Sequence, residues 1–221
     1  SEAMFHPRVE SGALIGRGAM DMKFAIACYI ELMKELGAEA RKLDMGLLLV
    51  SDEEMGSPSG VPVLLKKHGI RGEVVFLPDF GGVWEFEEAA KGIYVCNVEA
   101  HGEAAHSSVP WKGESAIRTL HDFLRELELF ILTLAKSDEW CPTINVGQFS
   151  GGTAFNQVPD HATARFDIRY PESGDLKRIQ REINRLLKKY PKVQVESFIN
   201  QSAYGIPRTN GEVRAFKRIA E

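Results

Sequence analysis

The sequence predicts an α/β unit followed by a separate α+β unit, and three observations lead to this prediction. Two short apolar runs, residues 45–51 and 73–79, flank a helix-length segment at 61–68, which is the pattern of a buried β-α-β motif. From residue 91 onward the chain alternates strand and helix patterns in the order β-α-β-β-α-β. The composition is that of a globular chain, with 44% hydrophobic and 26% charged residues among 221,.

In the first unit, residues 22–36 are expected to form a helix, because apolar residues recur at helical spacing and a glycine follows the run,. The apolar run 45–51 is typical of a strand buried on both faces, and it leads directly into the acidic residues 52–54,. The run 73–79 repeats this arrangement and ends at Asp79. Two such strands joined by a helix imply a parallel pair, whose carboxyl ends are where α/β proteins bind ligands.

The second unit is predicted to be a split βαβ, ferredoxin-like domain. Its strands are expected at 92–101, 143–149, 162–170 and 193–200, and its helices at 114–135 and 175–190. A further helix is expected from residue 212 to residue 221. We therefore divide the chain into residues 1–90, residues 91–202, and residues 203–221, which return to the first unit.

Charge and composition exclude several classes of function. The 27 basic and 31 acidic residues give a net charge of −4, so we expect no nucleic-acid partner. The longest apolar runs, 46–50 and 130–135, are far shorter than the roughly 20 residues of a membrane-spanning helix, so we expect no membrane partner. Cys28, Cys96 and Cys141 are odd in number and widely spaced, which argues against a disulfide framework and favours a cytoplasmic location.

Four carboxylates stand at the ends of the expected elements, namely Asp21, Glu53, Glu54 and Asp79. Oxygen ligands that converge on one sheet edge repel one another unless a cation lies between them, so a divalent ion or ion pair is one interpretation. Each residue also has a structural alternative, because Asp21 can cap the next helix, the glutamates can lie in a solvated turn, and Asp79 can begin a turn. Spacing alone leaves both interpretations open.

Five blocks along the chain resemble, in order, the signature motifs of one family. They are residues 16–23 (GRGAMDMK), 52–56 (DEEMG), 77–82 (LPDFGG), 105–110 (AHSSVP), and 151–160 (GGTAFNQVPD) followed by 167–169 (DIR). The family is that of the co-catalytic zinc peptidases and deacylases, which includes acetylornithine deacetylase, succinyl-diaminopimelate desuccinylase, aminoacylase, peptidase T and glutamate carboxypeptidase. Five motifs in the right order are far more specific than one, and they cover nearly the whole chain.

The resemblance implies a zinc-aminopeptidase-like catalytic domain, here partial, with an inserted ferredoxin-like lid and dimerisation domain. By the same resemblance Asp21 bridges two zinc ions, Glu54 and Asp79 each bind one of them, and Glu53 is the general base. Cobalt and manganese are alternatives to zinc. These roles are chemically consistent, because a bridging carboxylate can hold two cations roughly 3.5–4 Å apart, and a glutamate beside a pinned ligand is free to accept a proton.

The resemblance also assigns substrate-binding residues in the lid. His106 is expected to reach the substrate or an oxyanion, often in the active site of the partner subunit, and Asn156 and Arg169 are expected to hold the substrate. Gly151 and Gly152 are expected to form a turn that lets the backbone approach the substrate. The structural alternatives are a surface histidine for His106, a strand-end salt bridge for Arg169, and a plain tight turn for the glycines.

The sequence departs from the family pattern at three places. It contains neither the upstream His-x-Asp motif nor the C-terminal metal-binding histidine, and Phe24 stands where the family has glycine. We expect a piece of a longer enzyme rather than a shortened relative that no longer binds two zinc ions. His101 and His161 match no functional position of the family, and we expect both to face solvent.

The expected function is the zinc-dependent hydrolysis of an amide bond, by a peptidase, a carboxypeptidase or an N-acyl-amino-acid deacylase. The expected substrate is a small peptide or an N-acyl amino acid, and the expected partner is a second copy of the chain, bound through residues 91–202. The alternative is a non-catalytic dimerisation or binding protein, or an inactive fragment of the same fold. Metal content discriminates between these alternatives.

Overall fold

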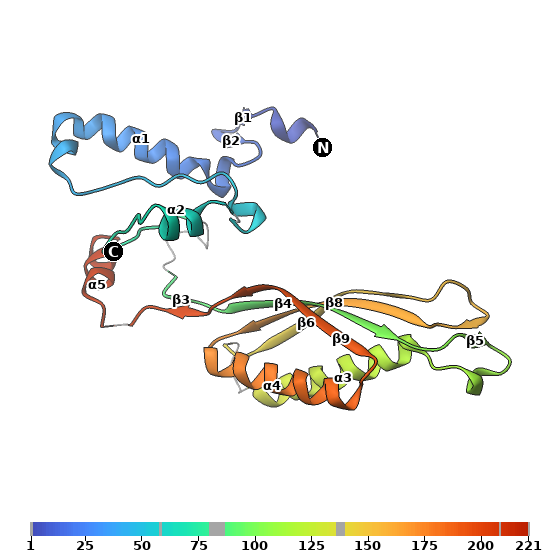
Figure 1. Ribbon diagram of the computed structural model, residues 1–221. Coiled ribbons are helices and arrows are strands. Elements are labelled where there is room, and N and C mark those ends of the chain that lie inside the picture. Colours follow the sequence, from blue (N-terminus) through green and yellow to red (C-terminus); the bar gives the residue numbers. More distant parts are fainter. Residues whose placement is uncertain (1, 58, 80–86, 136–139, 208, 221) are drawn as a thin grey trace. The chain divides into compact units, whose positions relative to one another are not determined.

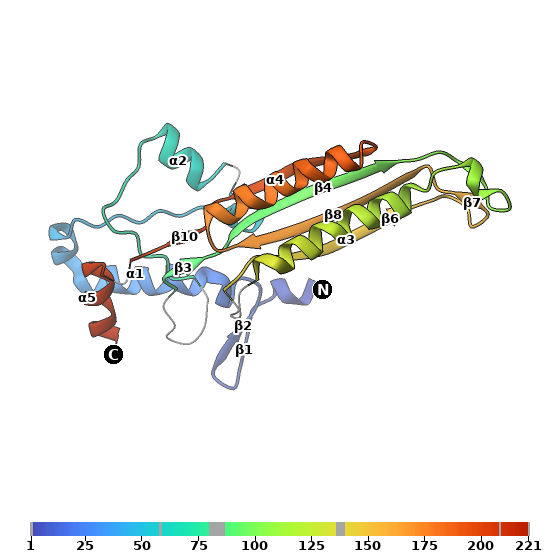
Figure 2. The same ribbon diagram turned by 90° about the horizontal axis from the view of Figure 1, so that it is seen from below.

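The computed structural model describes residues 2–57, 59–79, 87–135, 140–207 and 209–220. The chain divides into two compact units (Figures 1 and 2), one made of residues 1–86 and 215–221 and the other of residues 87–214. Among the described residues, no helix is both long enough and apolar enough to cross a membrane.

The second unit is built on a four-stranded antiparallel sheet. Its strands are β4 (Gly92–His101), β6 (Thr143–Gly151), β8 (His161–Tyr170) and β9 (Val193–Gln201), in the spatial order β6-β8-β4-β9. The helices α3 (Ala116–Leu134) and α4 (Ser173–Lys189) lie against one face of this sheet (Figure 1). The six elements predicted in this unit are confirmed, and their connection and spatial order are those of a ferredoxin-like fold.

The core of this unit forms between the sheet and the two helices. Along β8, Ala162, Ala164, Phe166 and Ile168 are buried while the alternate residues face away, as the two-residue period of a strand requires. On α3, buried residues recur at spacings of three and four, with Phe123 and Leu127 fully buried,. The opposite face of the sheet carries no covering helix in the described part of this unit.

Two small strand pairs lie beyond the ends of the sheet. At one end β5 (Ala105–His106) pairs with β7 (Gln157–Val158), and we call these two strands and their loops the tip. At the other end β3 (Ala89–Ala90) pairs with β10 (Tyr204–Gly205), and the Ile206 amide donates to the Glu88 carbonyl at 2.7 Å. The chain therefore enters and leaves this unit through adjacent strands.

Within its described residues, the first unit contains one hairpin, two helices and the C-terminal part of a third helix. The hairpin consists of β1 (Arg8–Glu10) and β2 (Ala13–Ile15), and the helices are α1 (Phe24–Leu36) and α2 (Val61–Lys67). Four short helical turns lie between or before these elements, namely η1 (Glu2–Phe5), η2 (Ala19–Lys23), η3 (Gly37–Lys42) and η4 (Glu53–Met55). The helix predicted at 61–68 is confirmed, and that predicted at 22–36 begins two residues later. The helix α5 (Gly211–Ala220), predicted at 212–221, starts after Asn210, whose side chain accepts from the Val213 amide at 3.0 Å,.

The strands predicted at 45–51 and 73–79 are wrong for this chain. Both segments lie outside any strand, and neither takes part in a sheet among the described residues. Their apolar side chains are exposed, with Leu49 at 53% and Val75 at 81%. Apolar composition alone does not make a strand, because a strand also requires a neighbour to accept and donate its backbone hydrogen bonds.

Candidate active site

Asp21 lies in the irregular turn that leads into α1. Gly18 enters this turn with a φ of 74°, a left-handed conformation that favours glycine,. Asp21 and Met22 then have non-helical backbone angles, and the peptide bond between them is cis. Lys23, not Asp21, precedes α1, and it makes no side-chain capping bond. The Asp21 side chain is exposed instead of capping the helix.

Glu53 and Glu54 lie on a turn that Asp52 holds in shape. The Asp52 carbonyl accepts from the amides of Met55 and Ser57 at 3.2 and 2.8 Å. Its side-chain oxygen Oδ2 accepts from the Ser59 amide at 2.9 Å. The two glutamate side chains are exposed, so they face solvent from a turn that the hydrogen bonds of Asp52 stabilise.

The charges of three neighbouring acidic residues act on Glu53. Partial burial raises this pKa above its ordinary value, and the negative charges of Asp79, Glu54 and Asp21 raise it further, in that order. The turn before α1, the Asp52 turn and the segment ending at Asp79 therefore bring their carboxylates into one electrostatic cluster. We call Asp21, Glu53, Glu54 and Asp79 the acidic cluster. Residues 80–82 of the motif around Asp79 lie outside the described residues.

The acidic cluster has the donor set that a divalent cation requires. Carboxylate oxygens are hard ligands, and a cation between them removes the repulsion that raises the pKa of Glu53,. Next to them, the Oδ1 atom of Asp52 is buried and has no hydrogen-bond partner within the described part of the chain. A buried acceptor of this kind calls for a water molecule or an ion. The residues present thus fit a metal site.

The tip of the second unit holds His106 and Asn156 close together. His106 pairs with Gln157 in the short β5–β7 ladder, and the Ser107 amide donates to the Asn156 carbonyl at 2.9 Å. Both side chains are exposed. Backbone hydrogen bonds therefore connect the segments that carry His106 and Asn156, which are about fifty residues apart in the sequence.

The hydrogen bonds of His106 define which ring nitrogen carries its proton. The Ser108 amide donates to Nδ1 at 3.2 Å, and the Ser108 hydroxyl lies 2.8 Å from the same atom. A backbone amide can only donate, so Nδ1 acts as an acceptor and the neutral ring carries its hydrogen on Nε2. The exposed Nε2–H group is then available as a donor to an oxygen atom of a ligand.

Gly151 and Gly152 connect β6 to the tip through a tight turn. A Cβ atom at position 151 would lie 2.8 Å from Ile117 Cγ1 and 2.9 Å from the Ala162 side chain. Gly152 has a φ of 75°. Within this unit the close approach at Gly151 is therefore to α3 and β8, and the left-handed turn at Gly152 accounts for the second glycine.

Arg169 lies at the other end of the sheet from the tip. It stands opposite Ile93 and Thr143, and its Nε donates to both carboxylate oxygens of Asp167 at 3.0 and 3.1 Å. Arg169 comes eight positions after His161 in β8, which is roughly 26 Å at the rise of a strand. Within one chain, Arg169 does not lie beside His106 and Asn156, and it forms the strand-end salt bridge.

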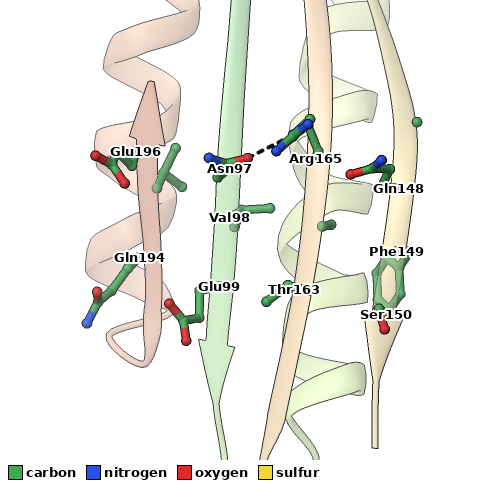
Figure 3. Close-up of a pocket in the computed structure, with 13 residues that line it drawn as sticks. Asn97, Val98, Glu99, Gln148, Phe149, Ser150, Thr163, Arg165, Gln194 and Glu196 are labelled. Atoms are coloured by element: carbon green, nitrogen blue, oxygen red, sulfur yellow. Dashed lines mark hydrogen bonds between the residues drawn. The ribbon is translucent and has the colours of Figure 1, made fainter. Parts of the chain in front are cut away.

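The open face of the sheet carries a hollow that the sequence analysis missed. It has a volume of about 850 Å³, and its polar lining includes Asn97, Glu99 and Arg165 (Figure 3). Arg165 Nε donates to Asn97 Oδ1 at 2.9 Å, and the guanidinium lies 4.9 Å from the centre of the Phe198 ring. The available signal was the alternation of polar residues along β4 and β8, all on the face opposite the helices.

Comparisons with known proteins give consistent matches. The model of the M20 peptidase dimerisation domain matches residues 89–194. A probable carboxypeptidase of Aspergillus clavatus is 32% identical over 200 residues, which cover 84% of this chain and 47% of the relative. An acetylornithine deacetylase of Myxococcus xanthus is 35% identical over 173 residues, covering 73% of this chain and 42% of the relative. The chain spans about half the length of the curated relatives it matches.

Two solved structures resemble the fold over nearly the whole chain. A tripeptidase of Staphylococcus aureus has a TM-score of 0.77 at 19% identity, and an aminopeptidase PepT of Bacillus cereus has a TM-score of 0.75 at 22% identity. Each match covers 97% of this chain and 58% of the other. At these identities the likeness shows the fold alone.

Proposed function

Because the chain belongs to the M20 family of peptidases and deacylases, we propose that the complete protein hydrolyses an amide bond in a small peptide or an N-acyl amino acid. The observation that carries this proposal is the electrostatic cluster of four carboxylates around Glu53. Amide hydrolysis at neutral pH requires an activated water, and this cluster combines a cation-binding donor set with a carboxylate that can accept a proton.

In this proposal Asp21, Glu54 and Asp79 would hold two divalent metal ions. Zinc is the expected metal, and cobalt and manganese are alternatives. When bound, such ions lower the pKa of water and draw electrons from the scissile carbonyl. Histidine ligands would complete the site in the longer protein, because this sequence contains no His-x-Asp motif.

Glu53 is the proposed general base. It follows Asp52 on the braced turn, and its exposed carboxylate stands next in sequence to Glu54, a proposed metal ligand. A carboxylate in that place can take a proton from water and return it to the leaving amine.

The lid residues are proposed to bind the substrate. His106 would donate from Nε2 to an oxyanion, since its Nδ1 already accepts from Ser108, and Asn156 stands beside it on the tip. Arg169 would pair with a substrate carboxylate through its guanidinium fork. Because Arg169 and the tip lie at opposite ends of the sheet, we propose that they belong to active sites of different subunits in a homodimer.

Metal content tests the proposed function first. The chain and the full-length protein are purified without chelator, and zinc is measured by elemental mass spectrometry together with turnover of dipeptides, tripeptides and N-acetyl amino acids. About two zinc ions per full-length chain with amide hydrolysis would support the proposal. A full-length protein that binds no metal in stoichiometric amount and hydrolyses none of these substrates would overturn it in favour of a binding protein.

A further inference from the structure

Three side chains of metal-binding types meet on the open face of the lid sheet. Glu99 and His101 come from β4, and His161 comes from β8. His161 Nε2 lies 2.5 Å from Glu99 Oε1, and His101 Nε2 lies 3.5 Å from the same oxygen. One ligand atom from each residue lies within 4.8 Å of the others.

The register of the sheet dictates this arrangement. His101 and His161 are directly opposite each other in the β4–β8 pair, and their ring centres are 5.4 Å apart. Glu99 stands two residues before His101, so the pleat places it on the same face. The neighbours Ala100 and Ala162 are fully buried on the other face, which fixes all three polar side chains on the open side.

The three side chains remain accessible to an ion from solvent. Their side chains are 44–51% exposed, and Glu99 also lines the hollow on the open face (Figure 3). Two imidazoles and a carboxylate are ligands that zinc and related divalent metals prefer, and three protein ligands leave a fourth position for water.

We propose that Glu99, His101 and His161 form a second metal site, which binds a divalent transition metal such as Zn²⁺. It is independent of the proposed catalytic metals, because all three ligands belong to the second unit. The site lies where β4 and β8 leave the sheet for the tip. A bound ion would cross-link the two strands that lead to His106 and Asn156.

A zinc titration of the 221-residue chain, followed by the ring signals of its histidines in ¹H–¹³C NMR, tests this site. The acidic cluster contains no imidazole, so ring signals separate the two kinds of metal site. We expect the signals of His101 and His161 to shift together along one saturating binding curve. In His161→Gln, the His101 response should require about tenfold more Zn²⁺ or greater, because one of three ligands is lost.

His121→Gln is the matched control. His121 is also an exposed histidine beside a carboxylate, with its Nδ1 atom 3.1 Å from Asp122 Oδ1. Among the described residues, however, His121 does not belong to any group of three side chains that could hold a metal ion. We expect this variant to leave the His101 and His161 response unchanged. The proposal would be overturned if the ring signals of His101 and His161 stay fixed in excess Zn²⁺. It would also be overturned if the His101 signal responds alike in His161→Gln and in the unsubstituted chain.

Discussion

Tyr170 lies across Gly92 in the β4–β8 pair, and its hydroxyl donates to the Gln201 carbonyl of β9 at 2.8 Å. A Cβ atom at position 92 would lie 2.2 Å from Tyr170 Cζ. The phenol therefore occupies the space that a side chain on β4 would fill, and it connects β8 to β9 over the strand between them. The ring is fully buried at 1% exposure.

This contact predicts that Gly92→Ala destabilises the chain by about 1–3 kcal/mol, the usual cost of overpacking a core. The ring must move, and it then loses its bond to Gln201. Gly147→Ala is the matched control, because a Cβ there would meet only Asn145 Nδ2 at 3.5 Å, and we expect a change within about 0.5 kcal/mol. Urea unfolding followed by circular dichroism measures both, and equal effects would refute the account of Gly92.

Glu53→Gln should abolish turnover of the full-length protein while metal binding persists. The amide cannot accept a proton, and the loss of a general base costs about 10²–10⁴ in kcat. Steady-state hydrolysis and metal content of the same preparation measure the two effects. Glu73→Gln, a neutralised exposed glutamate of the same unit, serves as the control and should keep wild-type rates; retained turnover in Glu53→Gln would remove the role assigned to it.

The pKa of Glu53 in the metal-free chain should lie above the ordinary glutamate value of about 4.3. Asp79→Asn should lower it, because the charge of Asp79 is the largest electrostatic cause of the shift. Carboxyl ¹³C shifts followed against pH in the presence of chelator give this pKa. Asp44→Asn, at an exposed aspartate that is not among the causes of the shift, should leave it unchanged.

The same shift has a defined effect on stability. The folded state holds this proton more tightly than the unfolded state, so the stabilising contribution is full below the unfolded pKa and is lost as pH rises through the folded pKa. The metal-free chain should therefore lose this contribution on going from acidic toward neutral pH, and bound metal should oppose the loss. A folded pKa of Glu53 at or below the ordinary value would contradict both expectations.

His106→Gln should lower kcat of the full-length protein by about 10²–10³, the range for loss of one oxyanion donor. Metal content should stay the same, because His106 is on the tip and not in the acidic cluster. His121→Gln on α3 is the control for loss of an exposed histidine. A His106→Gln enzyme with unchanged kcat would return this residue to the role of a surface histidine.

A homodimer through the lid predicts a light-scattering mass twice that of the 24.6-kDa chain. The outer strands of the sheet, β6 and β9, each pair with a strand on one side only within the described chain, and an open sheet edge is a template for pairing with a second copy. A mass of one chain at micromolar concentration would count against the dimer and against active sites shared between subunits.

The fold class predicted from sequence is confirmed by the family match and by the two peptidase structures. The second unit could be predicted because its strands alternate and its helices are amphipathic, as at β8 and α3, so local pattern and final packing agree,. The conformation of segments 45–51 and 73–79 could not be predicted in this way. Whether an apolar segment forms a strand depends on a neighbouring strand to pair with, and a local sequence pattern does not reveal that neighbour.

The candidate site was predictable in part. Motifs located the four carboxylates, and the structure brings them into electrostatic contact around Glu53. The distance between Arg169 and His106 was not predictable, because the order of motifs along the chain does not show that His106 lies on the tip at one end of the sheet and Arg169 at the other end. The meeting of His101 with His161 was missed for a related reason, since it depends on the register between strands sixty residues apart in sequence,.

The pairing of β3 with β10 has a consequence for how this protein can be cut and rejoined. The chain enters and leaves the lid through neighbouring strands, which lie about 4.8 Å apart in any sheet, and two antiparallel strands can be closed by a two-residue turn. A single excision between Ala90 and Tyr204 would thus remove the lid whole and leave ends that one short turn can join. For the same reason, the lid could be inserted into a loop of another protein, provided that the two ends of that loop lie on adjacent strands.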